Sequence, residues 1–200
     1  MGRRSDHSRA ELKELLLLEG HRQMAEVGFA RFSARDLAKR VGYSVGTIYN
    51  VFPSLDALFL EINTRTFDLW ADALRRKLEG VGGAHRIEAL VKGYFEFARA
   101  NRHLWTAIYD HHLPDGAEMP FELAERRGAL TQIVTTEVER ALPEAAEVDT
   151  QRLARSLIAT VHGHCAFALS GTFALMGETD PEEVALTRVR QSLVPEAPNS

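Results

Sequence analysis

The chain has 200 residues, of which 45% are hydrophobic and 26% are charged, and its formal net charge at pH 7 is −4. This hydrophobic content is enough to build a folded core, so the composition excludes an intrinsically disordered chain. A single cysteine, Cys165, excludes a disulfide framework within the chain and is typical of a protein in the reducing cytoplasm. No basic leader precedes a long apolar run, so we expect neither a signal peptide nor a membrane span.

The charge is distributed unevenly along the chain. Residues 1–52 contain nine Lys and Arg against six Asp and Glu, a net charge of +3, whereas residues 53–200 carry −7. Basic charge near the amino end is expected where a protein neutralises nucleic-acid phosphates. The asymmetry is modest and indicates DNA binding only together with a motif in the same segment.

The hydrophobic periodicity predicts an all-α protein of about nine helices, because no segment alternates as a strand does and no internal repeat is present. In chain order, helices are predicted over residues 9–27, two short segments within 33–52, then 54–79, 84–100, 102–112, 121–141, 149–176 and a last one after Asp180. That last helix has a clear beginning, since Asp180 can act as the cap and Pro181 suits the first helical position.

Residues 33–52 predict two short helices joined by a tight turn. Ser33 can cap the first helix, and Gly42 stands where that helix must end, because glycine tolerates a left-handed backbone. Ser44 can cap the second helix, whose inward positions are Val45 and Ile48. A helix pair with this turn is the arrangement that places a second helix in the DNA major groove.

The residues left on the outer side of this pair are small or form hydrogen bonds. We interpret the following as DNA contacts: Ser33, Arg35, Ser44, Gly46, Thr47, Tyr49 and Asn50, together with the inward-facing Val45 in the first turn of the second helix. Tyr49 offers a phenol to a phosphate and a ring to a thymine methyl, and Asn50 can pair with an adenine edge. The plainer interpretation is an ordinary solvated helix face. Arg3 and Arg4 are either an arm that reaches DNA or an inert tail.

Residues from about Arg9 to Phe67 resemble the DNA-binding domain of the tetracycline-repressor (TetR) family of bacterial regulators. The matching segments are Gly28-Phe29, Ser33-x-x-Asp36-Leu37-Ala38, Gly42-x-Ser44-x-Gly46-Thr47-Ile48-Tyr49 and Phe52-Pro53-Ser54-x-x-Ala57-Leu58. Two positions depart from the family pattern. Leu55 stands where the family commonly has a lysine near the DNA backbone, and His21 stands where it usually has an apolar core residue.

The resemblance implies a division into two domains. Residues 1–53 would form a helix-turn-helix DNA-binding domain with its motif at 33–52, and residues 54–200 a helical effector-binding and dimerisation domain. It also implies the partners: a near-palindromic double-stranded operator, a second copy of the chain and a small-molecule effector. A repressor in the cytoplasm, with no enzyme activity and no cofactor, is the function that the resemblance favours.

Aromatic and histidine residues accumulate in the larger domain and are candidates for an effector pocket, because such sites combine apolar walls with a few polar groups. The candidates are Trp70, Phe95, Trp105, Tyr109, His112, His162 and Cys165. They suggest a partly polar, ring-containing effector. The alternative is that most of them simply fill a helical core.

The predicted helix over 149–176 has apolar residues on more than one face, so it must be covered on more than one side. We expect the domain core on one side and a second subunit on another, with Leu153, Leu157, Val161 and Phe173 at the dimer interface. A helix buried within one subunit would show a similar pattern. Gly163 and Gly171 would permit close helix approach.

Two other functions remain open from the sequence. One is a DNA-binding regulator without a small-molecule effector, which the absence of a cavity larger than a few waters would favour. The other is a helical enzyme using Cys165 and His162. We predict no metal site, since neighbouring histidines on a helix point in different directions and His162 with Cys165 would supply only two ligands.

Overall fold

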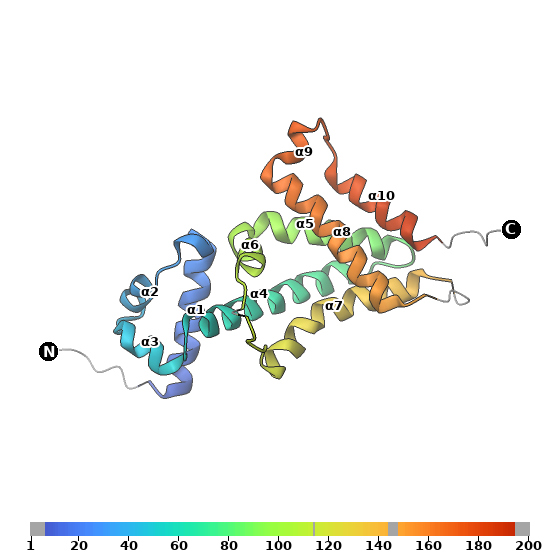
Figure 1. Cartoon of the computed structure of the whole chain (residues 1–200). Helices are drawn as coiled ribbons and strands as arrows, with labels where there is room; N and C mark the ends of the chain where they lie inside the picture. The colour runs from blue at the N-terminus through green and yellow to red at the C-terminus, as the bar shows by residue number, and fades with distance from the viewer. Residues whose placement is uncertain (1–6, 114, 144–147, 195–200) are drawn as a thin grey trace. The chain divides into compact units, whose positions relative to one another are not determined.

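The computed structural model describes residues 7–113, 115–143 and 148–194. Within these ranges the chain forms ten α-helices, a short 3-10 helix and no strand (Figure 1). They are α1 (Arg9–Val27), η1 (Phe29–Arg31), α2 (Ala34–Val41), α3 (Val45–Val51), α4 (Leu55–Leu78), α5 (His85–Ala100), α6 (Arg102–Asp110), α7 (Phe121–Ala141), α8 (Thr150–Ser170), α9 (Thr172–Leu175) and α10 (Pro181–Leu193). The predicted all-α fold is confirmed.

One predicted helix is wrong in its extent. The segment over 149–176 is not continuous, because α8 ends at Ser170 and the short α9 follows. Gly171 causes the break: its φ of 81° lies in the left-handed region, where residues with a side chain are disfavoured. The helix count is therefore ten in the described ranges.

The helices pack into two compact units. The first unit comprises Met1–Phe67 and Asn101–Glu125, and the second comprises Asp68–Ala100 and Arg126–Ser200. The chain passes from the first unit to the second inside α4, returns between α5 and α6, and passes to the second unit again inside α7. The predicted domain division at residue 53 assigns α6 to the larger domain, whereas the structure packs α6 against α1.

Two hydrogen bonds show why α6 belongs to the first unit. Asn63 on α4 donates through Nδ2 to the carbonyl of Ala107 on α6 at 3.1 Å, and this bond is buried. His103 on α6 lies with Nδ1 2.9 Å from the carbonyl of Ala25 on α1. These partners are 44 and 78 residues apart in sequence, so no local pattern predicts the packing.

The core of the first unit contains side chains from α1 to α4 and from α6. Leu16, Met24, Leu37, Ile48 and Phe52 are almost fully buried. Burial of these apolar side chains stabilises α2 and α3, which have eight and seven residues and are too short to persist alone.

His21 occupies an apolar position of this unit as a neutral imidazole. Its Nε2 lies 3.3 Å from Thr66 Oγ1, so the half-buried ring retains a polar neighbour. Burial first, and the nearby Arg65 charge second, lower the pKa of His21 to about 4. The ring is therefore uncharged at neutral pH.

In the second unit, α8 packs against α5 and α10, and α10 also packs against α5. Trp70 on α4 is buried, with its ring stacked on Phe97 at 4.9 Å and in an edge contact with Tyr94 at 4.7 Å. These aromatic contacts hold α5 against the second half of α4.

Candidate nucleic-acid interface and effector cavity

Local hydrogen bonds build the helix-turn-helix of α2 and α3 as the sequence predicts. The Ser33 side chain accepts from the Asp36 backbone N–H at 3.3 Å, and the Ser44 side chain accepts from Thr47 N–H at 3.2 Å. Gly42 ends α2 with φ 76° and ψ 26°, a left-handed conformation. The Tyr43 N–H then donates to the Ala38 carbonyl at 3.0 Å, which closes the turn.

The outer face of α3 is open to solvent. Ile48 is fully buried and anchors the helix, whereas Tyr49 is 49% exposed. Gly46 and Asn50 are also exposed, and Thr47 is half-buried. This helix therefore presents hydrogen-bonding groups outward over an apolar anchor, as a helix that enters a groove must do.

The remaining candidate DNA contacts lie around this face. Ser44 is exposed at the beginning of α3, and Ser33 is half-buried at the beginning of α2. Val45 is half-buried and packs against the core of the unit. Arg35 is exposed and, within the described residues, forms no ion pair, whereas Lys39 pairs with Asp36 at 3.7 Å. The Arg35 guanidinium is therefore available for a phosphate.

Two contacts near α3 involve residues that the sequence interpretation did not select. His7 Nδ1 lies 2.9 Å from the Tyr43 hydroxyl, and Arg9 Nη2 lies 3.4 Å from the Asn50 carbonyl. They bring the beginning of α1 beside the turn and the end of α3. Arg3 and Arg4 lie outside the described residues.

Leu55 also has a defined place in the first unit. It is half-buried and packs against the hydrophobic core. A lysine at this position would lose that contact. Leu55, which departs from the family pattern, therefore contributes to packing here.

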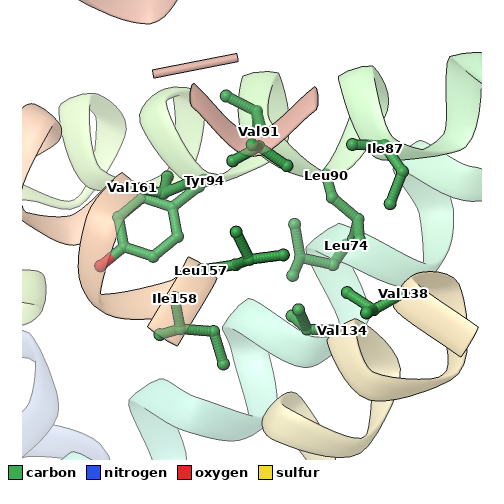
Figure 2. Close-up of a pocket in the computed structure, with 11 residues that line it drawn as sticks. Leu74, Ile87, Leu90, Val91, Tyr94, Val134, Val138, Leu157, Ile158 and Val161 are labelled. Carbon is green, nitrogen blue, oxygen red and sulfur yellow. The ribbon is translucent and has the colours of Figure 1, made fainter. Parts of the chain in front are cut away.

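An apolar cavity of about 40 Å³ lies in the second unit. Figure 2 shows the side chains that surround it, which come from α4, α5, α7, α8 and α10. Eleven residues line it, and ten of them are aliphatic: Leu74, Ile87, Leu90, Val91, Val134, Val138, Leu157, Ile158, Val161 and Val189. The eleventh is Tyr94, whose hydroxyl lies 3.0 Å from His162 Nδ1.

Two protein-family models match segments of this chain. The model described as "Bacterial regulatory proteins, tetR family" matches residues 16–62, and the model described as "Tetracyclin repressor-like, C-terminal domain" matches residues 87–191. The chain belongs to the TetR family. The resemblance read from the sequence is confirmed, and the TetR fold identifies a DNA-binding transcription regulator. A search of curated proteins finds no match.

Solved structures share this TetR fold over nearly the whole chain. A protein with unknown function from Rhodococcus sp. RHA1 is 24% identical, with 96% of this chain and 97% of that chain covered and a TM-score of 0.72. A TetR transcriptional regulator from the same organism is 17% identical, with coverage of 95% and 100% and a TM-score of 0.64. The multidrug binding protein EbrR, in complex with imidazole, is 19% identical, with coverage of 96% and 99% and a TM-score of 0.63.

The predicted effector residues of this TetR chain are divided between the two units. Trp105, Tyr109 and His112 belong to the first unit, where Trp105 and Tyr109 form an edge contact with centroids 5.3 Å apart and His112 is exposed. Trp70, Phe95, His162 and Cys165 belong to the second. The cavity lining includes none of the seven, although Trp70 and His162 contact its residue Tyr94. Aliphatic lining residues carry no sequence signal that separates them from ordinary core.

The predicted interface residues on α8 and α9 also fall into two groups. Leu157 and Val161 are buried within the single subunit and line the cavity, whereas Leu153 and Phe173 are half-buried. Another face of α8 is open, since a Cβ at Gly163 would meet no neighbouring atom within 4 Å.

Cys165 lacks the environment of a reactive thiol. The residue is fully buried, and this burial raises its pKa to about 12, so the thiol is protonated at neutral pH. Across the described residues, no cluster of three or more His, Cys, Asp or Glu is arranged to hold a metal ion. In the same ranges, no helix has the length and apolar character needed to cross a bilayer.

Proposed function

We propose that this chain is a homodimeric, one-component transcription repressor that binds a near-palindromic operator and is released by a small-molecule effector. The observation that carries the DNA-binding part is the outer face of α3, where Tyr49 is 49% exposed above a fully buried Ile48. Two copies of this helix would enter successive major grooves roughly 34–36 Å apart. Affinity would fall steeply with salt because phosphate neutralisation releases counterions.

The open face of α8 supports a homodimer. Ala159, Gly163 and Phe167 are spaced four residues apart and therefore share one side of the helix. Ala159 and Phe167 are exposed, and Gly163 has open space above it. Small residues at this spacing would let a second copy of the helix approach closely, with the Phe167 ring covered in the dimer.

The cavity and α4 support a response to an effector. The cavity is lined partly by Leu74, which lies in the same continuous helix as Leu58 in the core of the first unit. A ligand shifts such a protein only by its difference in affinity for two conformations, and coupling of about 1–3 kcal/mol is typical. EbrR, which has the same fold, is a multidrug binding protein, so this architecture is compatible with small-molecule binding.

The DNA-binding part is tested with Tyr49→Ala and a duplex selected from a random library. We expect the operator dissociation constant to rise roughly tenfold or more, because a phosphate contact and a base contact are lost. Tyr109→Ala, which removes another exposed tyrosine of the same unit, is the matched control. Fluorescence anisotropy measures affinity and thermal unfolding checks the fold. Equal affinity for Tyr49→Ala and the control would contradict the docking mode.

The homodimer is tested with Gly163→Glu. A carboxylate at this position meets open space within the subunit, so the fold should persist while the dimer dissociates. Gly128→Glu on α7 is the control, since a Cβ there also meets no neighbouring atom within 4 Å. Sedimentation should show a monomer for Gly163→Glu and a dimer for Gly128→Glu; a dimer for both would place the interface elsewhere.

One observation favours a second candidate, a regulator controlled without a small molecule. The apolar cavity of about 40 Å³ is only a few waters in size. Two larger hollows of about 490 and 550 Å³ in the same unit, lined partly by charged side chains, count against this candidate. The two candidates are separated by whether small molecules change operator affinity in purified protein, where no protein partner is present.

A further inference from the structure

The larger of the two hollows in the second unit has a lining that suits an anion. It measures about 550 Å³ and lies where the beginning of α5 meets the ends of α7 and α10. We propose that this arginine-lined hollow, which has Arg86, Arg140 and Arg190 in its wall, binds a carboxylate with a compact apolar body. The proposal names the ligand class of the effector response proposed above and rests on it.

The charges in the wall of the hollow are unequal. Among the described residues, three arginines and one glutamate line it. Arg86 donates to both carboxylate oxygens of Glu137, and Arg140 Nη1 donates to Oε1 of the same carboxylate at 2.8 Å. Two guanidiniums therefore share one negative charge. An anionic group of a ligand would compensate the excess positive charge and form charge-assisted hydrogen bonds.

Arg190 brings a further positive charge from α10. Its Nη2 donates to Glu88 at 3.0 Å, and its Nη1 lies 3.8 Å from Glu183. Glu88 also accepts from Lys92 Nζ at 2.6 Å, so this carboxylate too is shared by two cations. The side chains of Arg140 and Arg190 are 60% and 51% exposed. Each guanidinium has five N–H donors, so both arginines retain donors for a ligand carboxylate.

Apolar side chains in the same wall favour a ligand with an apolar body. Ile87 is buried, Leu193 is half-buried and Val194 is 68% exposed. The volume of about 550 Å³ lies within the range of about 300–1,000 Å³ that is typical of small-molecule sites. Ile87 also lines the apolar cavity of about 40 Å³ shown in Figure 2, which is too small for such a ligand.

The neighbouring hollow of about 490 Å³ has no such excess of positive charge. Its charged lining consists of two arginines and two glutamates: Arg75, Arg86, Glu79 and Glu137. Arg86 and Glu137 line both hollows, so this ion pair is a shared wall. The difference in charge assigns the anion to the arginine-lined hollow and makes the neighbouring one a source of control variants.

Arg86 also connects the hollow to α4. Its Nη1 donates to the carbonyls of Leu78 and Val81 at the end of that helix. A ligand carboxylate that competes with Glu137 for these guanidiniums would change the bonding at the end of α4. The ligand would then prefer one conformation over another, which is the difference in affinity that an effector needs.

The ligand class is tested by isothermal titration calorimetry on the full-length protein. Adamantanecarboxylate, adamantanecarboxamide and adamantylammonium share one shape and differ in charge, and acetate supplies the anionic group alone. We expect the carboxylate to bind roughly tenfold more tightly than the amide and to weaken as NaCl is raised, because salt screens exposed charges. Equal or tighter binding of the amide, the ammonium ion or acetate, or no binding of any probe, would overturn the proposal.

Two variants test the arginines. Arg140→Gln and Arg190→Gln should each weaken adamantanecarboxylate roughly threefold to tenfold and leave adamantanecarboxamide nearly unchanged. Arg75→Gln is the matched control, because Arg75 is 54% exposed in the same unit but lines the neighbouring hollow. Wild-type affinity in both variants, or an equal loss in the control, would contradict the assigned site.

Both variants should fold, because the carboxylates that they leave keep a cation. Glu137 retains its two bonds from Arg86, and Glu88 retains Lys92. Thermal unfolding without ligand checks this. A chain that ends at Val194 removes residues 195–200, which lie outside the described ranges, and should bind adamantanecarboxylate as the wild type does. Much tighter binding would assign the hollow to the chain's own end and overturn the proposal.

Operator affinity, measured with and without adamantanecarboxylate, separates this inference from the proposed function. Binding that is lost in Arg140→Gln but does not release DNA would support the ligand site and contradict effector control. Release of DNA that persists unchanged in Arg140→Gln and Arg190→Gln would overturn the site. Intact operator binding with no affinity for any probe would also overturn it and leave DNA binding unaffected.

Discussion

Arg86 on α5 donates hydrogen bonds to both carboxylate oxygens of Glu137 on α7, from Nε to Oε2 at 2.6 Å and from Nη2 to Oε1 at 2.8 Å. Its Nη1 donates to the carbonyls of Leu78 at 3.1 Å and Val81 at 2.6 Å, at the end of α4. One guanidinium therefore joins three segments of the second unit. Arginine suits this role because its donors form a rigid planar fork.

Arg86→Ala should destabilise the second unit, because Glu137, whose side chain is 4% exposed, would lose its main partner. We expect the melting temperature to fall by roughly 5–10 °C, with a smaller fall for Arg86→Lys, which keeps the charge but not the fork. The hydrogen bond from Arg86 lowers the pKa of Glu137, so the pair stabilises the fold above the ordinary pKa of a glutamate and less as pH falls.

Thermal unfolding of the wild type and both variants at pH 7 and pH 4 checks this. The difference between wild type and Arg86→Ala should be smaller at pH 4. An unchanged melting temperature for Arg86→Ala at pH 7 would show that the pair contributes little to stability.

The DNA-binding motif could be predicted from the sequence because its signals are local. The caps at Ser33 and Ser44 bond to backbone groups three residues away, and Gly42 shows the end of α2 directly. The pair of Arg86 and Glu137 spans 51 residues and has no such signal. The cavity was not predictable for a related reason, since its aliphatic residues look like any helical core until five helices bring them together.

The break between α8 and α9 shows where local interpretation failed. The apolar residues continue beyond Gly171, so the periodicity alone extended the helix to residue 176. The left-handed backbone of Gly171 ended it instead. A glycine within an apolar helical pattern is compatible with close packing or with a helix end, and tertiary structure decides between them.

Gly46→Ala should separate DNA affinity from stability. A Cβ at Gly46 would lie 3.6 Å from Ser44 Oγ, an ordinary contact, so alanine fits the folded chain. Because alanine is favoured in helices, we expect stability to stay the same or rise by up to about 1 kcal/mol. The added methyl would hold α3 away from the DNA backbone and weaken operator binding, which we expect by roughly tenfold.

Gly128→Ala is the matched control, because this helical glycine is exposed and has open space around it. Anisotropy titrations with the selected duplex should show wild-type affinity for Gly128→Ala. Wild-type affinity for Gly46→Ala as well would mean that this position does not approach DNA.

Gly20→Ala tests the close approach of α1 and α4 in the first unit. A Cβ at Gly20 would lie 2.8 Å from Ile62 Cδ1, and both residues are buried. The helix preference of alanine would be outweighed by overpacking, so we expect a net loss of about 1 kcal/mol. Adding Ile62→Val removes the crowded methyl, so the double variant should lose less stability than the two single variants together. Denaturant unfolding of all four proteins measures the coupling, and additive losses would contradict the crowding.

His21 should make the fold less stable in mild acid. Above its ordinary pKa of 6.5, the imidazole is neutral in both the folded and the unfolded chain and has no effect. Below that pH the unfolded chain binds a proton, while the folded chain, with a His21 pKa of about 4, does not. Protonation therefore favours unfolding, and the free energy of unfolding should fall by about 1 kcal/mol between pH 7.5 and 5, after allowance for partial exposure of the ring. His21→Leu should reduce this dependence and leave the part that comes from His162, whose pKa is also lowered by burial. Replacement of the exposed His112 by leucine controls for the loss of one imidazole. Urea unfolding at both pH values measures the effect, and coincident pH profiles for wild type and His21→Leu would show that the ring is not held neutral by burial.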